Sequence, residues 1–241
     1  MLKIAPSILS ADFARLGEEI ESVRQGGADW IHYDVMDGVF VPNISIGLPV
    51  LASVRKATDM FLDVHLMIEK PVRYARRFCE AGADLVTVHA EADTPENITA
   101  AIAEIKAAGK MAAVALKPAT AAEAVLPWLD TLDMVLVMSV EPGFSGQSYI
   151  EGSEEKVAAV AEMARAVGND SLLIEVDGGV SEATVERLTA AGADVLVCGS
   201  AVFGAQDPAA ALAAVKEKGD AARVAAIEDA RAEEALVEEE M

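Results

Sequence analysis

The segment Ala81-Gly82-Ala83-Asp84-Leu85-Val86 recurs along the chain, each time between an amphipathic stretch and an apolar run. The glycine of each copy is predicted to follow a helix in the left-handed backbone region, where other residues are strained. From Gly27 to Gly82 is 55 residues, from Gly82 to Gly109 is 27, and from Gly109 to Gly192 is 83. These spacings are near multiples of about 28 residues, the length of one strand and helix with their loops. The other copies are Gly26-Gly27-Ala28-Asp29-Trp30-Ile31, Ala191-Gly192-Ala193-Asp194-Val195-Leu196 and, more loosely, Ala108-Gly109-Lys110-Met111.

Eight short apolar runs alternate with these amphipathic stretches, which predicts an α/β protein with a parallel sheet. The near-regular repeat favours a closed (β/α)8 TIM barrel over an open doubly wound sheet, and eight units need roughly 220 residues. We expect a single barrel domain over residues 1–218 and an acidic tail rich in Ala and Glu over residues 219–241. The predicted strands are Lys3–Ile8, Trp30–Val35, Phe61–Leu66, Leu85–His89, Met111–Leu116, Met134–Val140, Leu173–Val176 and Val195–Cys198.

Two helix starts are predicted from capping residues. Ser10 is expected to cap a helix that buries Phe13, Leu16, Ile20 and Val23, because these recur at three- and four-residue steps. Thr94-Pro95 is expected to start another helix, since proline is favoured in the first turn.

Composition excludes several classes of protein. The chain of 241 residues has 40 Asp and Glu against 19 Lys and Arg, so it has no basic stripe for nucleic acid. The chain contains no run of about 20 apolar residues, which is the length needed to span a membrane. The first residues lack a signal peptide, and Cys79 and Cys198 fit buried free thiols, so we expect a cytoplasmic protein.

Polar side chains at the strand ends indicate a metal site. His32 and Asp34 lie two residues apart and so share one face of a strand, while His65 and Asp177 end two other strands. Two imidazoles and two carboxylates suit Zn, Fe, Mn or Co. His89 is taken to have no acidic neighbour at strand spacing, so we interpret it as a buried, hydrogen-bonded residue.

Glycine-bearing turns follow the last three strands and predict a phosphate site that needs no lysine. Glycines allow backbone N–H groups to approach an anion closely, and phosphate sites occur near the last strands of such barrels. The turns contain Gly143, Phe144, Ser145 and Gly146, then Gly178 and Gly179, and finally Gly199 and Ser200.

From about Lys3 to Pro208 the chain resembles the ribulose-phosphate 3-epimerase family. The most distinctive motif is His32-Tyr33-Asp34-Val35-Met36-Asp37-Gly38-Val39-Phe40-Val41-Pro42-Asn43. The others, in the family's order, are Ala5–Asp12, Asp63–Met67, Pro142–Gln147, Glu175–Val180 and Gly192–Ser200.

The resemblance implies a role for each matching residue. It makes Asp34 and Asp177 the two acid/base residues, and His32, Asp34, His65 and Asp177 the ligands of one divalent metal ion per subunit. It implies that Met36, Met67 and Met138 line the site. The implied substrate contacts are Ser7, His65, Gly143, Phe144, Ser145, Gly146, Asp177, Gly178, Gly179, Gly199 and Ser200.

The sequence departs from the family at three positions. Glu141 stands where many members have Asn, Ser145 where many have a third glycine, and Leu48 where a proline is frequent. The Pro142–Gln147 loop could also act as a lid that excludes water.

The implied function is that of an isomerase of the pentose phosphate pathway. It would interconvert D-ribulose 5-phosphate and D-xylulose 5-phosphate by removing and returning the C3 proton on opposite faces. An allulose-6-phosphate 3-epimerase would need the same residues, so this alternative stays open. A related decarboxylase is disfavoured because Asp34–Gly38 contains no lysine. A sugar-phosphate-binding protein without catalysis would not need the ligand set, and formation of a homo-oligomer is left open.

Overall fold

The predicted strands form one parallel eight-stranded sheet in a computed structural model, which describes residues 2–240. β1 ends at Pro6 rather than at Ile8, because Ile8 begins a 3-10 helix, and β6 ends at Met138. The remaining ends agree with the prediction to within one residue. The strands are β1 Lys3–Pro6, β2 Trp30–Met36, β3 Phe61–Met67, β4 Leu85–His89, β5 Met111–Leu116, β6 Met134–Met138, β7 Leu173–Asp177 and β8 Val195–Cys198.

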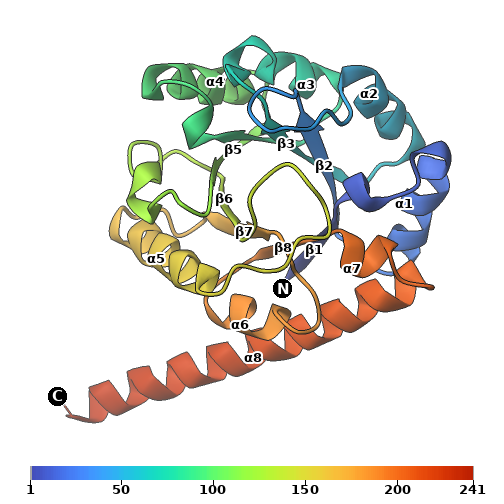
Figure 1. Ribbon diagram of the computed structural model, residues 1–241. Helices are drawn as coiled ribbons and strands as arrows, with labels where there is room; N and C mark the ends of the chain where they lie inside the picture. Colours follow the sequence, from blue (N-terminus) through green and yellow to red (C-terminus); the bar gives the residue numbers. More distant parts are fainter. Residues whose placement is uncertain (1, 241) are drawn as a thin grey trace.

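The sheet curls into the predicted barrel (Figure 1). Its order is β1-β8-β7-β6-β5-β4-β3-β2, so the first two strands form the seam. A parallel bridge between Ser7 and His32 joins that seam at the end of β1. The barrel therefore closes beside two residues that the sequence assigned to the site.

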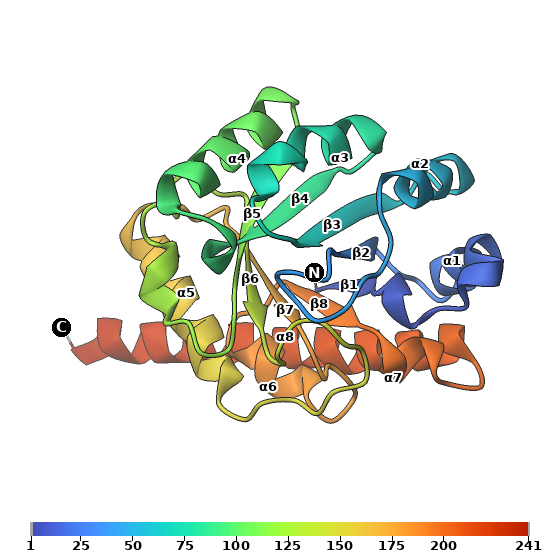
Figure 2. The ribbon, with the colours of Figure 1, turned by 45° about the horizontal axis from the view of Figure 1, so that its top comes forward.

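Helices surround the strands, as the turned view in Figure 2 shows. The α-helices are α1 Leu16–Gln25, α2 Leu48–Ala57, α3 Ala75–Ala81, α4 Pro95–Ala107, α5 Ser153–Ala166, α6 Val185–Ala190, α7 Ser200–Phe203 and α8 Pro208–Glu240. Short 3-10 helices are η1 Ile8–Ser10, η2 Phe13–Arg15, η3 Pro71–Arg73, η4 Ala90–Ala92 and η5 Ala122–Val125.

One of the two predicted caps is confirmed. The Thr94 hydroxyl accepts a hydrogen bond from the backbone of Asn97 at the start of α4. The cap at Ser10 is wrong, because the chain there makes two 3-10 turns, capped by Ser7 and Asp12, before α1 begins. Phe13 is 46% exposed and does not join the core face of α1.

Side chains alternate along each strand between the helices and the barrel interior. Ile31 and Tyr33 belong to the main apolar core with helix residues such as Ile98. The intervening His32 and Asp34 therefore face inward, where both are buried. Cys79 and Cys198 are buried free thiols, as predicted.

The repeated aspartate of the sequence connects neighbouring strands at their amino ends. Each such aspartate directly precedes an even-numbered strand and accepts a hydrogen bond from the second residue of the preceding strand. A Lys or Arg lies beside each one. The backbone bonds, from 2.8 to 3.0 Å long, join Asp29 to Ile4, Asp84 to Leu62, Asp133 to Ala112 and Asp194 to Ile174. The basic partners are Lys216, Arg55, Lys106 and Arg223, in the same order.

The looser fourth copy of the repeat, at Gly109, follows a helix and precedes a strand as predicted, but it carries no equivalent aspartate. Gly109 has the predicted positive φ, at 70°, but it precedes the odd-numbered β5. Its neighbour Lys110 instead binds Asp84. Asp133, before β6, is the fourth equivalent aspartate, and no glycine precedes it to mark it in the sequence.

Helix α8 runs across the boundary predicted between residues 218 and 219. Gly219 is buried so closely that a Cβ there would lie 2.2 Å from the Leu2 side chain. Arg223 binds Asp194 at 2.6 Å, and beyond it the helix extends past the barrel (Figure 1). The division into barrel and tail stays a prediction. Among residues 2–240, no helix is long and apolar enough to cross a membrane.

Candidate active site

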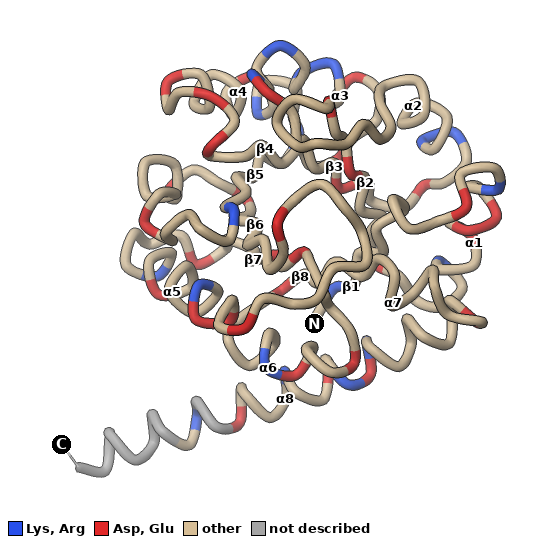
Figure 3. The backbone as a smooth tube through the Cα atoms, viewed as in Figure 1, with Lys and Arg blue, Asp and Glu red and all other residues tan. Residues whose placement is uncertain are grey.

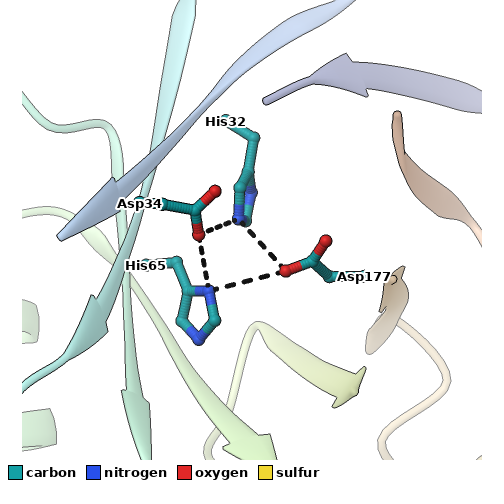
Figure 4. Close-up of side chains that lie close together, drawn as sticks. All are labelled: His32, Asp34, His65 and Asp177. Carbon is teal, nitrogen blue, oxygen red and sulfur yellow. Dashed lines mark hydrogen bonds and ion pairs between the residues drawn. The ribbon is translucent and has the colours of Figure 1, made fainter. Parts of the chain in front are cut away.

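Two imidazoles and two carboxylates meet at the carboxyl ends of the strands (Figure 4). Asp34 Oδ1 lies 3.2 Å from His32 Nε2 and 3.1 Å from His65 Nδ1. Asp177 Oδ2 lies 3.9 Å from the same His32 nitrogen and 3.8 Å from the same His65 nitrogen. The four predicted ligands are thus brought together, each with one atom directed at a common point.

Strand register explains this convergence. His32 and Asp34 share the interior face of β2, and Asp34 is the direct neighbour of His65 on β3. Asp177 ends β7, which lies three strands away from β2 around the ring. Since parallel strands end at one rim, the side chains meet there despite their separation in sequence.

The residues fit a divalent transition metal. All four ligand atoms lie within 4.8 Å of one another. His32 Nε2 is buried and has no hydrogen-bond partner among the described residues, although it points into the cluster. A buried nitrogen without a partner is costly, and two nitrogen and two oxygen donors match the preferences of such metals.

The two carboxylates differ in their surroundings. Burial opposes ionisation of Asp34, but His32 and His65 outweigh it and hold the pKa of Asp34 well below its usual range. Burial and the nearby charge of Asp34 raise the pKa of Asp177 to about 6. One carboxylate is therefore held ionised, while the pKa of the other lies near neutrality.

A second pair of acids lies beneath His32. His32 Nδ1 is 2.5 Å from Asp63 Oδ2 and 3.6 Å from Glu175 Oε1, and both acids are fully buried. Burial, together with the neighbouring Asp63, raises the pKa of Glu175 well above its usual range. Asp63 thus accepts a hydrogen bond from His32 Nδ1–H, which leaves Nε2 to face the ligand cluster.

His89 lies behind His65 and was not assigned to the site by the sequence. Its Nε2 is 2.8 Å from His65 Nε2, and its Nδ1 is 3.2 Å from Glu91 Oε2. Burial lowers the pKa of His89 to about 4, so the ring is neutral near pH 7. The interpretation of His89 as a buried, hydrogen-bonded residue is confirmed. The statement that it lacks an acidic neighbour is wrong, because Glu91 stands at strand spacing.

A cleft above the ligands brings together most of the predicted substrate contacts. Ser7 lies at its base, where the hydroxyl donates to Asp34 Oδ2 at 2.5 Å. His65 is fully buried beneath the cleft, so its contact with substrate stays a prediction. The other residues that line the cleft include Gly143, Phe144, Ser145, Gly146, Asp177, Gly178, Gly179, Gly199, Ser200, Met36, Met67 and Met138.

Glycine is required at two positions of the cleft. Gly178 and Gly179 have φ of +124° and +63°, a region strained for other residues. A Cβ at Gly178 would lie 2.5 Å from Val140, and one at Gly179 would lie 2.5 Å from the backbone nitrogen of Tyr149. Neither position can hold a side chain without displacing the loop that follows β6, to which Val140 and Tyr149 belong.

The loop after β6 crosses the mouth of the barrel. Asn43 donates to the backbone oxygen of Gly143 at 2.9 Å, and the hydroxyls of Ser10 and Ser145 are 2.5 Å apart. Ser10 was not identified from the sequence as a site residue. Figure 3 shows no Lys or Arg in this crossing loop, and none lines the cleft. An anion in this cleft would have to be held by backbone N–H groups and hydroxyls, and the phosphate site stays a prediction.

The fold and the cleft define a (β/α)8-barrel protein with a candidate active site at the carboxyl ends of its strands. The model of the ribulose-phosphate 3 epimerase family matches residues 3–203. The chain therefore belongs to the ribulose-phosphate 3-epimerase family, and its function is the isomerisation of a pentose phosphate.

Known relatives cover almost the whole chain. The ribulose-phosphate 3-epimerase of Mycobacterium bovis is 51% identical over 220 residues, which is 91% of this chain and 93% of the relative. That of Bacillus subtilis is 51% identical over 216 residues, which is 90% and 99% of the two chains. Among solved structures, a 3-hexulose-6-phosphate synthase has a TM-score of 0.66 at 25% identity, covering 90% of this chain and 99% of that one.

Proposed function

We propose that the chain interconverts D-ribulose 5-phosphate and D-xylulose 5-phosphate through Asp34 and Asp177, with one divalent metal ion per subunit. The observation that carries this proposal is the cluster of two carboxylates and two imidazoles under the cleft. The family supports epimerisation, and the cluster supports the roles of individual residues.

His32, Asp34, His65 and Asp177 would hold the metal. A bound divalent ion would supply Lewis-acid stabilisation of the negative charge that develops on the substrate. Zn, Fe, Mn and Co all accept two imidazoles and two carboxylates. The choice among these metals is left to measurement.

Asp34 and Asp177 would exchange the C3 proton on opposite faces of the sugar. This hydrogen is adjacent to the C2 ketone, so its removal leaves a delocalised enediolate. Inversion needs one acid/base group on each face, and the two aspartates lie on strands three positions apart around the ring. Because the reaction is reversible, each aspartate serves as base in one direction and as acid in the other.

The glycine turns would hold the phosphate. Backbone N–H groups around Gly178–Gly179, Gly199–Ser200 and the loop 143–146 can donate to an anion without adding a charged side chain. The Ser145 hydroxyl adds a donor where many family members have glycine. The protein charge of −21 then does not prevent binding, because the polar contacts are local.

A side-by-side assay tests the choice of substrate. We expect kcat/KM for ribulose 5-phosphate to exceed that for allulose 6-phosphate by about tenfold or more, since one extra carbon must fit the same cleft. The reverse preference would identify the six-carbon alternative. Binding of both sugars without turnover in metal-loaded protein would instead favour a sugar-phosphate-binding protein. The cytoplasmic location and the oligomeric state remain predictions from the sequence.

A further inference from the structure

His65 uses only one ring nitrogen in the proposed metal cluster. Its Nδ1 faces Asp34 and Asp177, whereas its Nε2 points away from the cluster (Figure 4). That second nitrogen meets His89 Nε2 at 2.8 Å. Because a hydrogen bond needs one donor and one acceptor, only one of these two facing nitrogens carries a proton.

Glu91 determines which of the two facing nitrogens, His65 Nε2 or His89 Nε2, carries the proton. Its carboxylate accepts from the backbone N–H of Lys117 at 2.8 Å and from the Thr120 hydroxyl, both through Oε1. Burial opposes ionisation of Glu91, but these contacts and His89 lower its pKa to about 2. An ionised carboxylate can only accept, so His89 Nδ1 must donate its proton to Oε2.

The positions of the remaining imidazole protons follow from the contacts of Glu91 with His89 and of His89 with His65. A neutral His89 with its proton on Nδ1 presents a lone pair at Nε2. His65 Nε2 must then donate to it, so Nδ1, which faces Asp34 Oδ1 at 3.1 Å, is the nitrogen that can give its lone pair to a metal. The identity of one partner of an imidazole thereby fixes which nitrogen is free to bind a metal.

We propose that Glu91 and His89 are positioning residues that hold His65 with its Nδ1 lone pair directed at the metal. The inference rests on the proposed metal-assisted function. The placement of the imidazole protons is set by Glu91, which lies beyond the cleft and two contacts away from His65.

Glu91→Gln tests this directly, because it replaces the acceptor that faces His89 with a donor and keeps the shape of the side chain. Lys117 N–H and the Thr120 hydroxyl still require an acceptor, so the amide oxygen takes the Oε1 position. The amide NH2 then faces His89 Nδ1 and donates to it. His89 must then carry its proton on Nε2 and donate it to His65 Nε2. The proton of His65 is thereby held on Nδ1, the nitrogen that would have to bind the metal.

The experiment measures zinc affinity by competition with a chelator and records long-range 1H–15N spectra of the imidazoles. The chain has only three histidines, so each ring can be assigned. We expect wild-type His89 to be protonated on Nδ1, and His65 on Nε2. In Glu91→Gln we expect the His89 proton on Nε2 and a zinc dissociation constant raised about tenfold to a hundredfold. The matched control is Glu123→Gln, which removes one exposed charge and should leave both readouts unchanged.

Two results would overturn the inference. One is a wild-type His89 protonated on Nε2. The other is a Glu91→Gln protein whose zinc affinity and His89 spectrum match those of the wild type. Failure of the wild type to bind zinc or another divalent metal would overturn the proposed metal-assisted function instead. The His89 spectrum of that same metal-free protein would still decide whether the proton order is right.

Discussion

Asp34 and Asp177 are the same kind of side chain, yet their surroundings move their pKa values in opposite directions. Two imidazoles stabilise the ionised form of Asp34, while burial and the charge of Asp34 favour the protonated form of Asp177. Pairs of acids separated in this way are suited to act as base and acid in one reaction. A bound metal would change both pKa values together, because both carboxylates would be ligands of the same ion.

Replacement of Asp34 by Asn tests its role at the residue scale. The amide keeps the size of the side chain and one oxygen ligand but cannot take a proton. We expect kcat to fall by about a hundredfold or more. Metal content should be measured on the same sample, so that loss of the base is separated from loss of the metal. Turnover near the wild-type value would contradict the two-base mechanism.

Individual site residues show which parts of the site could be predicted from the sequence and which could not. His32 and Asp34 were predictable because two-residue spacing places both on one strand face. Asp63 and Glu175 obey the same spacing relative to His65 and Asp177, so they could have been identified as interior acids. The contact between Ser10 and Ser145 could not, because it depends on how two loops 135 residues apart meet.

At the scale of elements, the four repeated aspartates make equivalent contacts between successive pairs of strands, so the barrel has an approximate fourfold repeat. Each one joins two strands through a backbone N–H and is neutralised by a Lys or Arg. The strands and their order were predictable from this repeat and the apolar runs. The cap at Ser10 was not, because Ser7, Ser10 and Asp12 all offer capping oxygens and helix periodicity does not choose among them.

Asp84→Ala tests the structural role of this repeat. Asp84 accepts from Leu62 N–H at 3.0 Å and pairs with Arg55 and Lys110. We expect the free energy of unfolding to fall by about 1–3 kcal/mol, because the Leu62 donor loses its partner. Chemical denaturation measures this, and kcat should be unchanged. Asp130→Ala, at an exposed position, serves as the control and should stay within about 0.5 kcal/mol of the wild type. Equal stability of the two variants would show that the repeat does not hold the strands together.

At the scale of the whole molecule, α8 belongs in part to the barrel. Its own residues Leu212 and Val215 are buried, and Gly219 and Arg223 continue the contact with the barrel beyond residue 218. The sequence placed a boundary at 218 because composition becomes rich in Ala and Glu there. Composition alone could not show that a buried glycine and one arginine still pack against the first and eighth strand units.

Truncation locates the true end of the barrel. A chain that ends at Arg223 should retain the unfolding free energy of the full chain to within about 0.5 kcal/mol. A chain that ends at Lys218 loses the bond from Arg223 to Asp194 and exposes Leu2, so we expect it to be about 1–3 kcal/mol less stable. Thermal and denaturant unfolding of the two chains gives the comparison. Equal stability of both would place the boundary where the sequence analysis put it.

The central claim is that this barrel removes and returns the C3 proton of ribulose 5-phosphate with the help of a metal. Proton NMR of that sugar in deuterated water, with the purified protein before and after chelation and metal restoration, tests it most directly. We predict that deuterium enters C3 as xylulose 5-phosphate forms, that both changes stop on chelation, and that both return with metal. Absence of exchange at C3 in protein with verified metal would contradict the account.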